Sequence, residues 1–115
     1  MTLSECYEGL GLNYEKVLSC LLNENMMKKF VLKFLDDKSF QELEEGLAAA
    51  DGEKAFRAAH TLKGVCLNLV FDNLYKVGAE LTGKLRGLDT TGSEELFDAV
   101  KTEYVKLTDA IKQID

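Results

Sequence analysis

The sequence predicts an all-α domain, and three features of its 115 residues carry this prediction. Proline, which breaks or kinks a helix when it lies in the interior, is absent. Leucine, alanine, glutamate and lysine are frequent and recur at spacings of three and four, which is the period of an amphipathic helix. Glycines and short polar clusters are the only breaks in this pattern. We therefore expect one domain over residues 1–115, in which antiparallel helices form a single bundle.

One or two short helices are expected at the amino terminus. Ser4 can cap the first helix with its hydroxyl group, and Gly9 and Gly11 mark the end of that helix. Asn13 is a typical cap for a second short helix, which we expect to run to about Leu22.

A longer apolar repeat follows a polar break at residues 23–25. Apolar side chains recur at helical spacing from Met26 to Leu35. Ser39 is expected to cap the next helix, and Glu42, three residues later, would complete a capping box. The sequence leaves open whether these two segments form one continuous helix.

Three further helices are expected in the rest of the chain. The Asp-Gly pair at 51–52 forms a compact turn, and a long helix follows over about 53–71. Another helix covers about 72–86, and the segment 87–92, which reads GLDTTG, is the clearest loop. A serine followed by two glutamates begins the last helix, over about 93–114.

The charge balance excludes several classes of partner. Twenty acidic residues against fourteen basic ones give a net charge of -6. Nucleic-acid binders usually carry the opposite balance, and anionic membrane surfaces are disfavoured for the same reason. We therefore expect neither nucleic acid nor membrane as a partner.

The few histidines and cysteines indicate a protein without a metal or cofactor of its own. One histidine and three scattered cysteines do not supply the paired ligands of a zinc site or the ligands of a di-iron site. Cys6, Cys20 and Cys66 lie in apolar stretches and are odd in number, so we expect small core residues of a reduced, cytoplasmic protein. The longest apolar run, from Val17 to Leu22, is far shorter than a membrane span, and a signal peptide is not expected.

The expected helix 53–71 carries the only histidine, His60. A rotation of about 100° per residue places His60 opposite a stripe of apolar residues, so the imidazole should face solvent. Gly64 follows one turn later and leaves space above the ring, while Lys63 and Arg57 could each approach an anion carried on it. The apolar stripe, which we expect to face the core, comprises Ala55, Ala58, Ala59, Leu62, Val65, Cys66 and Leu69.

Three larger apolar residues, Phe56, Leu67 and Phe71, fall on the half of this helix turned away from the stripe. A helix within a bundle touches two neighbours, so part of that half can belong to the core. The other interpretation is an exposed rim where another protein docks. The two interpretations are balanced for Phe56 and Phe71, and docking is favoured for Leu67.

A lone exposed histidine has few chemical roles. His60 has no serine and acid for a triad, and general-base catalysis usually needs a pocket with orienting groups. Nucleophilic attack on a phosphoryl group remains, because a neutral imidazole can accept one. Phosphoryl transfer depends mainly on positioning and charge stabilisation, so magnesium and an acceptor carboxylate can belong to a partner.

These residues resemble the histidine-containing phosphotransfer (HPt) domain family. The resemblance rests on the segment AAHTLKG around His60, on Asn68, Leu69, Leu74 and Leu81 after it, and on the run-up FLDDKSFQELEEGLAAADGEKAFR before it. It covers about residues 13–86 well and the last helix, 93–114, only by pattern.

Met1 before a plausible first helix favours an intact small protein, although a piece of a larger sensor kinase would have the same pattern.

The resemblance implies an antiparallel four-helix bundle that relays phosphoryl groups and is not an enzyme. His60 would be the phosphorylation site, Lys63 the charge partner of the phosphoryl oxygens, and Gly64 the clearance for the partner. The partners would be response-regulator receiver domains, with magnesium on the receiver, and a hybrid or sensor histidine kinase. We expect a monomer that contacts them through Phe56, Arg57, Leu67 and Phe71.

The sequence departs from the family pattern at three places, and one alternative function stays open. Residues 65–67 are bulkier than usual, and Val70 replaces a common glycine, which predicts that the helix continues there. Thr82 replaces a glutamate or glutamine that often reaches the histidine. The alternative is an HPt-like docking or inhibitory module whose histidine is not phosphorylated; an unrelated helical bundle with an ordinary surface histidine would leave the HTLKG register unexplained.

Overall fold

The computed structural model describes residues 1–21 and 23–115, and every regular element among them is a helix. The predicted all-α class is therefore confirmed. The elements are α1 (Leu3–Gly9), α2 (Tyr14–Leu21), α3 (Glu24–Lys33), the short 3-10 helix η1 (Phe34–Asp36), α4 (Ser39–Ala48), α5 (Gly52–Leu69), α6 (Asp72–Leu85) and α7 (Glu94–Ile111).

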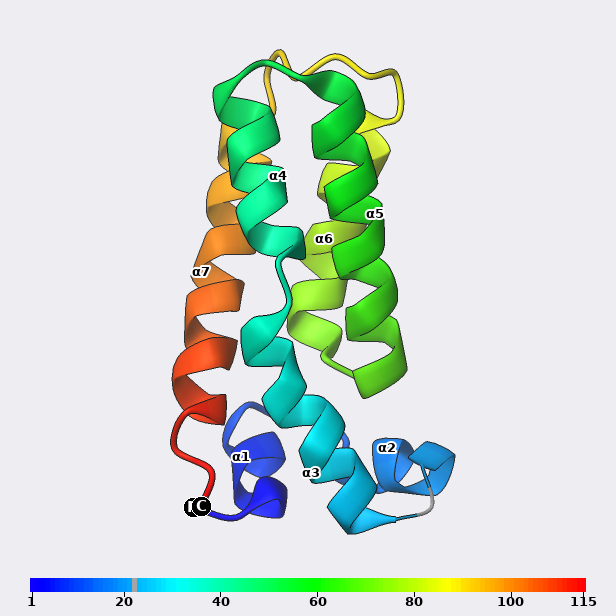
Figure 1. The fold of residues 1–115 in the computed structure, drawn as a ribbon, viewed down its shortest axis with the longest axis vertical. Helices are drawn as coiled ribbons and strands as arrows, with labels where there is room; N and C mark the ends of the chain where they lie inside the picture. Colours follow the sequence, from blue (N-terminus) through cyan, green and yellow to red (C-terminus); the bar gives the residue numbers. More distant parts are fainter. Residues whose placement is uncertain (22) are drawn as a thin grey trace.

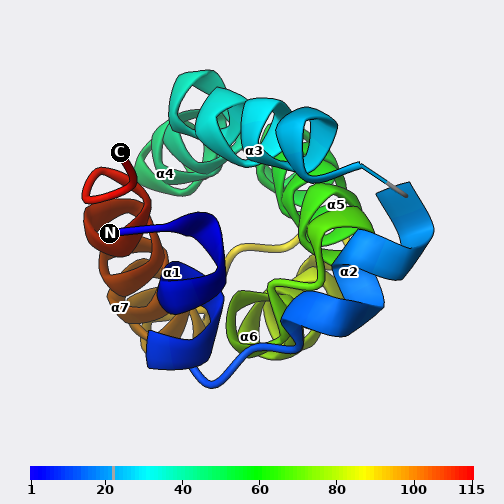
Figure 2. The same ribbon diagram turned by 90° about the horizontal axis from the view of Figure 1, so that it is seen from below.

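Helices α4 to α7 form an antiparallel four-helix bundle, and α1 to α3 cover its lower end (Figure 1). Viewed from that end, α5 and α7 occupy opposite corners of the bundle (Figure 2). The close approach of α4 and α5 needs a glycine at position 46, because a Cβ there would lie 2.8 Å from the backbone nitrogen of Ala55. The bundle thus fixes α5 between α4 and α6 and leaves one side of α5 uncovered.

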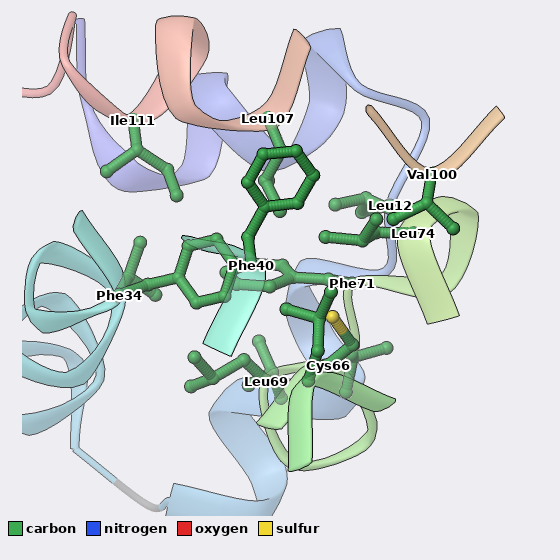
Figure 3. Packing of buried hydrophobic residues seen from close by; sticks show 14 of the residues in the cluster. Leu12, Phe34, Phe40, Cys66, Leu69, Phe71, Leu74, Val100, Leu107 and Ile111 are labelled. Carbon is green, nitrogen blue, oxygen red and sulfur yellow. The ribbon is translucent and has the colours of Figure 1, made fainter. Parts of the chain in front are cut away.

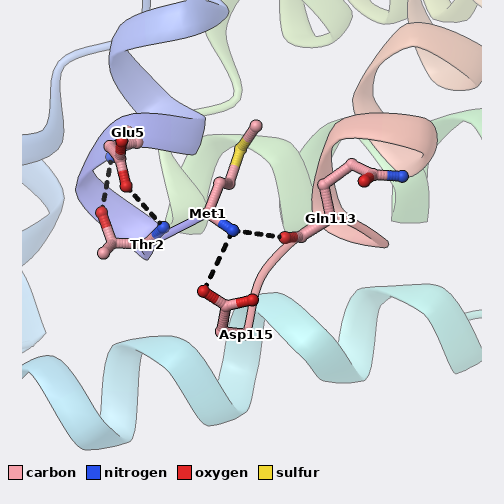
Figure 4. Close-up of polar contacts among 5 residues, drawn as sticks. All are labelled: Met1, Thr2, Glu5, Gln113 and Asp115. Carbon is pink, nitrogen blue, oxygen red and sulfur yellow. Dashed lines mark hydrogen bonds and ion pairs between the residues drawn. The ribbon is translucent and has the colours of Figure 1, made fainter.

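The caps of the first two helices were only partly predicted. Thr2, not Ser4, caps α1: its hydroxyl accepts from the Glu5 N–H, and the Glu5 carboxylate accepts from the Thr2 N–H, at 3.1 and 2.9 Å (Figure 4). The prediction for Ser4 is therefore wrong, and a capping box of Thr2 and Glu5 begins α1 instead. Asn13 caps α2 as predicted, since its side chain accepts from the Lys16 N–H at 3.0 Å. The expected end of this helix at Leu22 lies outside the described residues.

The chain does not run as one helix from α3 to α4. It tightens into η1 and then becomes extended at Asp37, where φ is -71° and ψ is 131°. The predicted capping box of Ser39 and Glu42 is wrong, because Ser39 is the first residue of α4 and has no capping role. Instead, the Asp37 carboxylate accepts from the Ser39 N–H at 2.8 Å. Asp37 thus satisfies the Ser39 N–H group, which the Glu42 carboxylate would have satisfied in the predicted capping box.

Helix α5 ends at Leu69, two residues before the predicted end. Val70 adopts a left-handed conformation with φ of 57°, and the Phe71 N–H donates to the Cys66 carbonyl at 2.9 Å. This is a Schellman ending, in which glycine is the usual left-handed residue. The prediction that Val70 continues the helix is therefore wrong.

An aromatic cluster joins α1 to the end of α5. The Phe71 ring lies 5.2 Å from the ring of Phe34, centroid to centroid (Figure 3). On its other side the Tyr7 ring lies 5.9 Å away. The Tyr7 hydroxyl donates to the Leu69 carbonyl at 2.7 Å, which satisfies one of the free carbonyls at the helix end. The termini also meet, since the Met1 ammonium donates to the Gln113 carbonyl at 2.8 Å (Figure 4).

The three cysteines are free, and their environments differ. Cys6 and Cys66 are buried as predicted, but Cys20 is exposed, so its assignment to the core is wrong. Helical spacing predicts which side of α2 is apolar. It does not predict which residues on that side are covered by another element, and Cys20 is not covered.

Burial makes stability pH-dependent on the alkaline side. Desolvation raises the pKa of Cys66 from its ordinary 9.0 to about 12. Above pH 9 the unfolded chain loses this proton while the folded chain keeps it, so stability that is complete below pH 9 is lost progressively up to about pH 12. We expect the free energy of unfolding to fall by about 1.4 kcal/mol per pH unit from this thiol. Urea titrations should show a shallower fall for Cys66→Ala and an unchanged one for Cys20→Ala; equal slopes in all three proteins would contradict the account.

Ala50 occupies a left-handed position that favours glycine. Its φ is 53°, and it ends α4 in a second Schellman motif, with the Asp51 N–H donating to the Gly46 carbonyl at 2.8 Å. Because the Ala50 side chain is exposed, Ala50→Gly loses little packing and should raise the free energy of unfolding by about 0.5 to 1 kcal/mol. Ala49→Gly, at a φ of -90°, should lower it. Thermal unfolding followed by circular dichroism tests both, and destabilisation by Ala50→Gly would contradict the strain argument.

Candidate functional site

Helix α5 presents His60 on the side away from the core. Asp51 caps this helix, accepting from the Lys54 N–H at 3.1 Å. The predicted core stripe is buried except for Val65, which is only half-buried, so its full assignment to the core is wrong. His60 itself is exposed, as predicted from its position opposite Leu62.

Phe56 lies one turn before His60 and faces its ring. The two rings are nearly parallel, with an interplanar angle of 20° and centroids 6.1 Å apart. Phe56 is half-buried and packs against the core cluster, so one part of this residue belongs to the core and another faces the imidazole. The core interpretation of Phe56 is therefore partly right, whereas a contact of Phe56 with a partner stays a prediction.

Two basic side chains flank the histidine in the sequence of α5, and they differ in exposure and in ion pairing. Arg57 is exposed and forms an ion pair with Glu53, one turn earlier. Exposed pairs of this kind contribute little stability, so an incoming anion can compete for the guanidinium. Lys63 is half-buried, and none of the ion pairs among the described residues contains it. Of the two flanking basic residues, Lys63 is therefore the one without a carboxylate partner among these ion pairs.

Packing does not require a glycine at position 64. A Cβ built on Gly64 meets no atom within 4 Å, in contrast to Gly46. Glycine inside a helix costs roughly 0.5 to 1 kcal/mol relative to alanine, so this fold bears a cost that its own contacts do not explain. Gly78 and Gly83 in α6 are equally unconstrained. What distinguishes Gly64 is its position one turn from an exposed histidine.

The expected docking rim is smaller than the sequence suggested. Leu67 is 60% exposed, whereas Phe71 is only 1% exposed and lies in the aromatic cluster of the core. The prediction that Phe71 contacts a partner is therefore wrong. Its side chain turns inward because α5 ends at Leu69 and the left-handed residue Val70 redirects the chain.

Thr82 stands where a glutamate or glutamine often reaches the histidine, but its side chain does not take over that role. Its side chain is fully buried, and its hydroxyl donates to the Gly78 carbonyl in the preceding turn of α6 at 2.7 Å. The hydroxyl is therefore occupied within its own helix and does not orient the imidazole.

A groove that sequence analysis did not identify adjoins the carboxyl end of α5. It has a volume of about 720 Å³ and is lined mainly by apolar side chains. We call it the α3–α5 groove; its apolar lining comprises Cys20, Phe30, Phe34, Val65, Leu67 and Leu69. The apolar repeat of α3 could be recognised in the sequence. Its position beside α5 could not, because it depends on the break at η1.

The described residues contain no cluster of three or more potential metal ligands. None of the helices in the described ranges is both long and apolar enough to span a membrane. The arrangement around His60 combines an exposed imidazole, a lysine one turn away and open space at position 64. These features suit group transfer to a macromolecule better than reaction within an enclosed pocket.

Comparison with known families gives one match. Residues 32–115 match the family model described as the Hpt domain. No curated protein and no solved structure matches the chain significantly. The matched segment contains α4 to α7, whereas α1, α2 and most of α3 precede it.

Proposed function

The chain belongs to the Hpt domain family, and from this premise we propose that it is a phosphorelay intermediate of two-component signalling in which His60 carries the phosphoryl group. The exposure of His60 on the uncovered side of α5 is the observation that supports this role best. The family's general role is phosphotransfer between signalling proteins, and the assignment to particular residues is the proposal.

The proposed reaction exchanges one bond to phosphorus for another. A nitrogen of the neutral His60 imidazole attacks the phosphorus of a receiver phosphoaspartate, the bond from the aspartyl oxygen to phosphorus breaks, and the aspartate leaves as a carboxylate. The reverse sequence passes the group to a second receiver. Lys63 stabilises the charge on the phosphoryl oxygens, and Gly64 lets the receiver approach the ring. Magnesium belongs to the receiver in this scheme.

The proposal also covers the setting of the reaction. The chain acts as a carrier without catalytic turnover of its own, as a monomer, between receiver domains and a hybrid or sensor histidine kinase. Three free cysteines fit a reducing compartment, so we place the exchange in the cytoplasm. Phe56, Arg57 and Leu67 would contribute to the contact surface.

The test mixes the purified chain with receiver domains whose aspartates carry radioactive phosphate. We expect at least one receiver to lose label while the chain gains it, and a second receiver to remove it again. Binding of a receiver without any transfer would contradict the relay and support a docking or inhibitory module instead. Absence of both binding and transfer would contradict both functions.

Lys63→Ala is expected to slow this transfer by about tenfold, the loss of roughly one charge-assisted hydrogen bond in the transition state. The helical circular dichroism signal should not change, because an unpaired lysine contributes little to stability. Rapid-quench measurement of label transfer gives the rate. Lys76→Ala, at another exposed lysine, on α6, is the control. Equal rates for Lys63→Ala and the unmodified chain would exclude the assigned role.

A further inference from the structure

We propose that Phe56 is a positioning residue for phosphoryl transfer, whose ring holds the imidazole of His60 in one orientation and leaves the ring nitrogens free. This inference rests on the proposed function and deepens it, because it assigns a residue that acts through His60 and not on the phosphoryl group itself. A histidine that attacks phosphorus must direct one nitrogen at it, so a group that restricts rotation of the ring favours the reaction.

Hydrogen bonds do not fix the orientation of this imidazole. None of those found in the described part of the chain involves the His60 ring. The Thr82 hydroxyl donates to the Gly78 carbonyl, and the Arg57 guanidinium pairs with Glu53. The last side-chain torsion of a histidine is broad, so an exposed imidazole without any neighbour has no single orientation.

The Phe56 ring lies against a face of the imidazole. The two ring planes differ by 20°, and the centroids are 6.1 Å apart, within the range of offset-stacked aromatic pairs. Helical side chains lean toward the amino terminus, so the His60 ring lies over the turn that carries Phe56. The imidazole nitrogens interact through the edge of the ring and not through its face. A neighbour on the face therefore opposes rotation without blocking the attacking nitrogen.

The surroundings of the two rings are asymmetric. Phe56 is half-buried and packs against the buried hydrophobic cluster, so the core holds the ring that contacts the imidazole. On the opposite side of His60, a Cβ at position 64 would meet no atom within 4 Å. The imidazole is thus supported from the turn before it and open toward the turn after it, where the partner has to approach.

The test compares Phe56→Leu, which keeps an apolar side chain but removes the flat ring, with Phe56→Tyr, which keeps the ring. The donor is the phosphorylated receiver that transfers fastest to the unmodified chain. Phe56→Leu should lower the maximal rate of transfer at saturating receiver by about tenfold, with little change in the receiver concentration that gives half this rate. Phe56→Tyr should transfer at close to the rate of the unmodified chain.

Phe97→Leu is the matched control for lost packing. Phe97 on α7 is also half-buried and stacks on Phe40, with ring centroids 5.6 Å apart. Helix α7 occupies the corner of the bundle opposite α5 (Figure 2). Phe97→Leu should lower the temperature of thermal unfolding about as much as Phe56→Leu does, without a change in the rate of transfer. An equal loss of rate in both variants would overturn the inference.

Nuclear magnetic resonance of the free chain provides a readout that needs no phosphoryl group. Nuclear Overhauser contacts between the ring protons of Phe56 and His60 should be present in the unmodified chain, with the His60 resonances shifted by the phenyl ring current. Phe56→Leu should remove this shift and Phe56→Tyr should retain it.

Three results would contradict the positioning role: no contact between the rings in the unmodified chain, an unchanged maximal rate in Phe56→Leu, or an effect of Phe56→Leu on the half-saturating receiver concentration alone. The last result would make Phe56 a docking residue. Ring contacts that Phe56→Leu removes, combined with no label on His60 from any donor, would support the ordering of the ring and overturn the relay.

Discussion

Replacing His60 by glutamine is expected to abolish phosphoryl transfer to the chain. Glutamine keeps a polar side chain at an exposed position, so the helix and the core should be unaffected. It has no nucleophilic nitrogen, and the initial rate of labelling should fall on the order of 10³-fold or more. Label transfer from a phosphorylated receiver, followed over time, measures the effect.

Binding separates loss of chemistry from loss of docking in this variant. The His60→Gln chain should still bind the receiver with a Kd close to that of the unmodified chain, because most of the proposed contact lies around the histidine. Circular dichroism should give the same helix content. Labelling of His60→Gln at the original rate would contradict the assignment of the nucleophile.

Gly64→Leu is expected to lower the rate of transfer by about 100-fold, since even a small misplacement of reacting groups has an effect of this size. A leucine side chain one turn from the imidazole would hold the receiver's aspartate away from it. The same change should stabilise the helix by roughly 0.5 to 1 kcal/mol, because a Cβ at this position meets no neighbouring atom and leucine favours helices. Activity and stability should therefore change in opposite directions.

Gly9→Leu is the matched control for this prediction. Gly9 is exposed at the end of α1, and a Cβ added there would also meet open space, but this residue lies far along the chain from the histidine. This variant should transfer at the original rate. Normal transfer by Gly64→Leu would contradict the clearance argument, and a loss of stability would contradict the open space above position 64.

The exposed face of α5 could be predicted because it depends only on the spacing of apolar residues within this one helix. The 3.6-residue period places His60 opposite Leu62 without knowledge of the neighbouring helices. Asp51 precedes α5 in a position where an aspartate commonly caps, and its side chain does so. The exposure of His60 and the start of α5 follow from local sequence, which is why both could be predicted.

The end of the same helix was not predictable from local preference. A β-branched residue such as Val70 rarely adopts a left-handed conformation, so the sequence favoured continuation of the helix. Burial of Phe71 against Phe34 and Tyr7 stabilises the ending instead. These contacts join three segments that are distant in the sequence, which is why the sequence left a core position and a docking position equally open for Phe71.

The groove beside α5 also depends on tertiary structure. The Asp37 carboxylate accepts from the first N–H group of α4, that of Ser39, and the extended backbone at position 37 separates the direction of α3 from that of α4. Phe30 and Leu67 therefore line one groove although their helices contact each other little. Sequence periodicity identified the apolar sides of both helices but contains no information on how those sides face each other.

The position and chemical form of the phosphoryl group provide the most direct test of the central claim. After transfer from a labelled receiver, the chain is digested and the modified peptide is identified by mass spectrometry, and the linkage is characterised by its stability in acid and alkali. We expect a phosphoryl group on His60 alone, released in acid and retained in alkali. A phosphoryl group on another residue, or a linkage stable in acid, would contradict the assignment of His60 as the phosphoryl carrier.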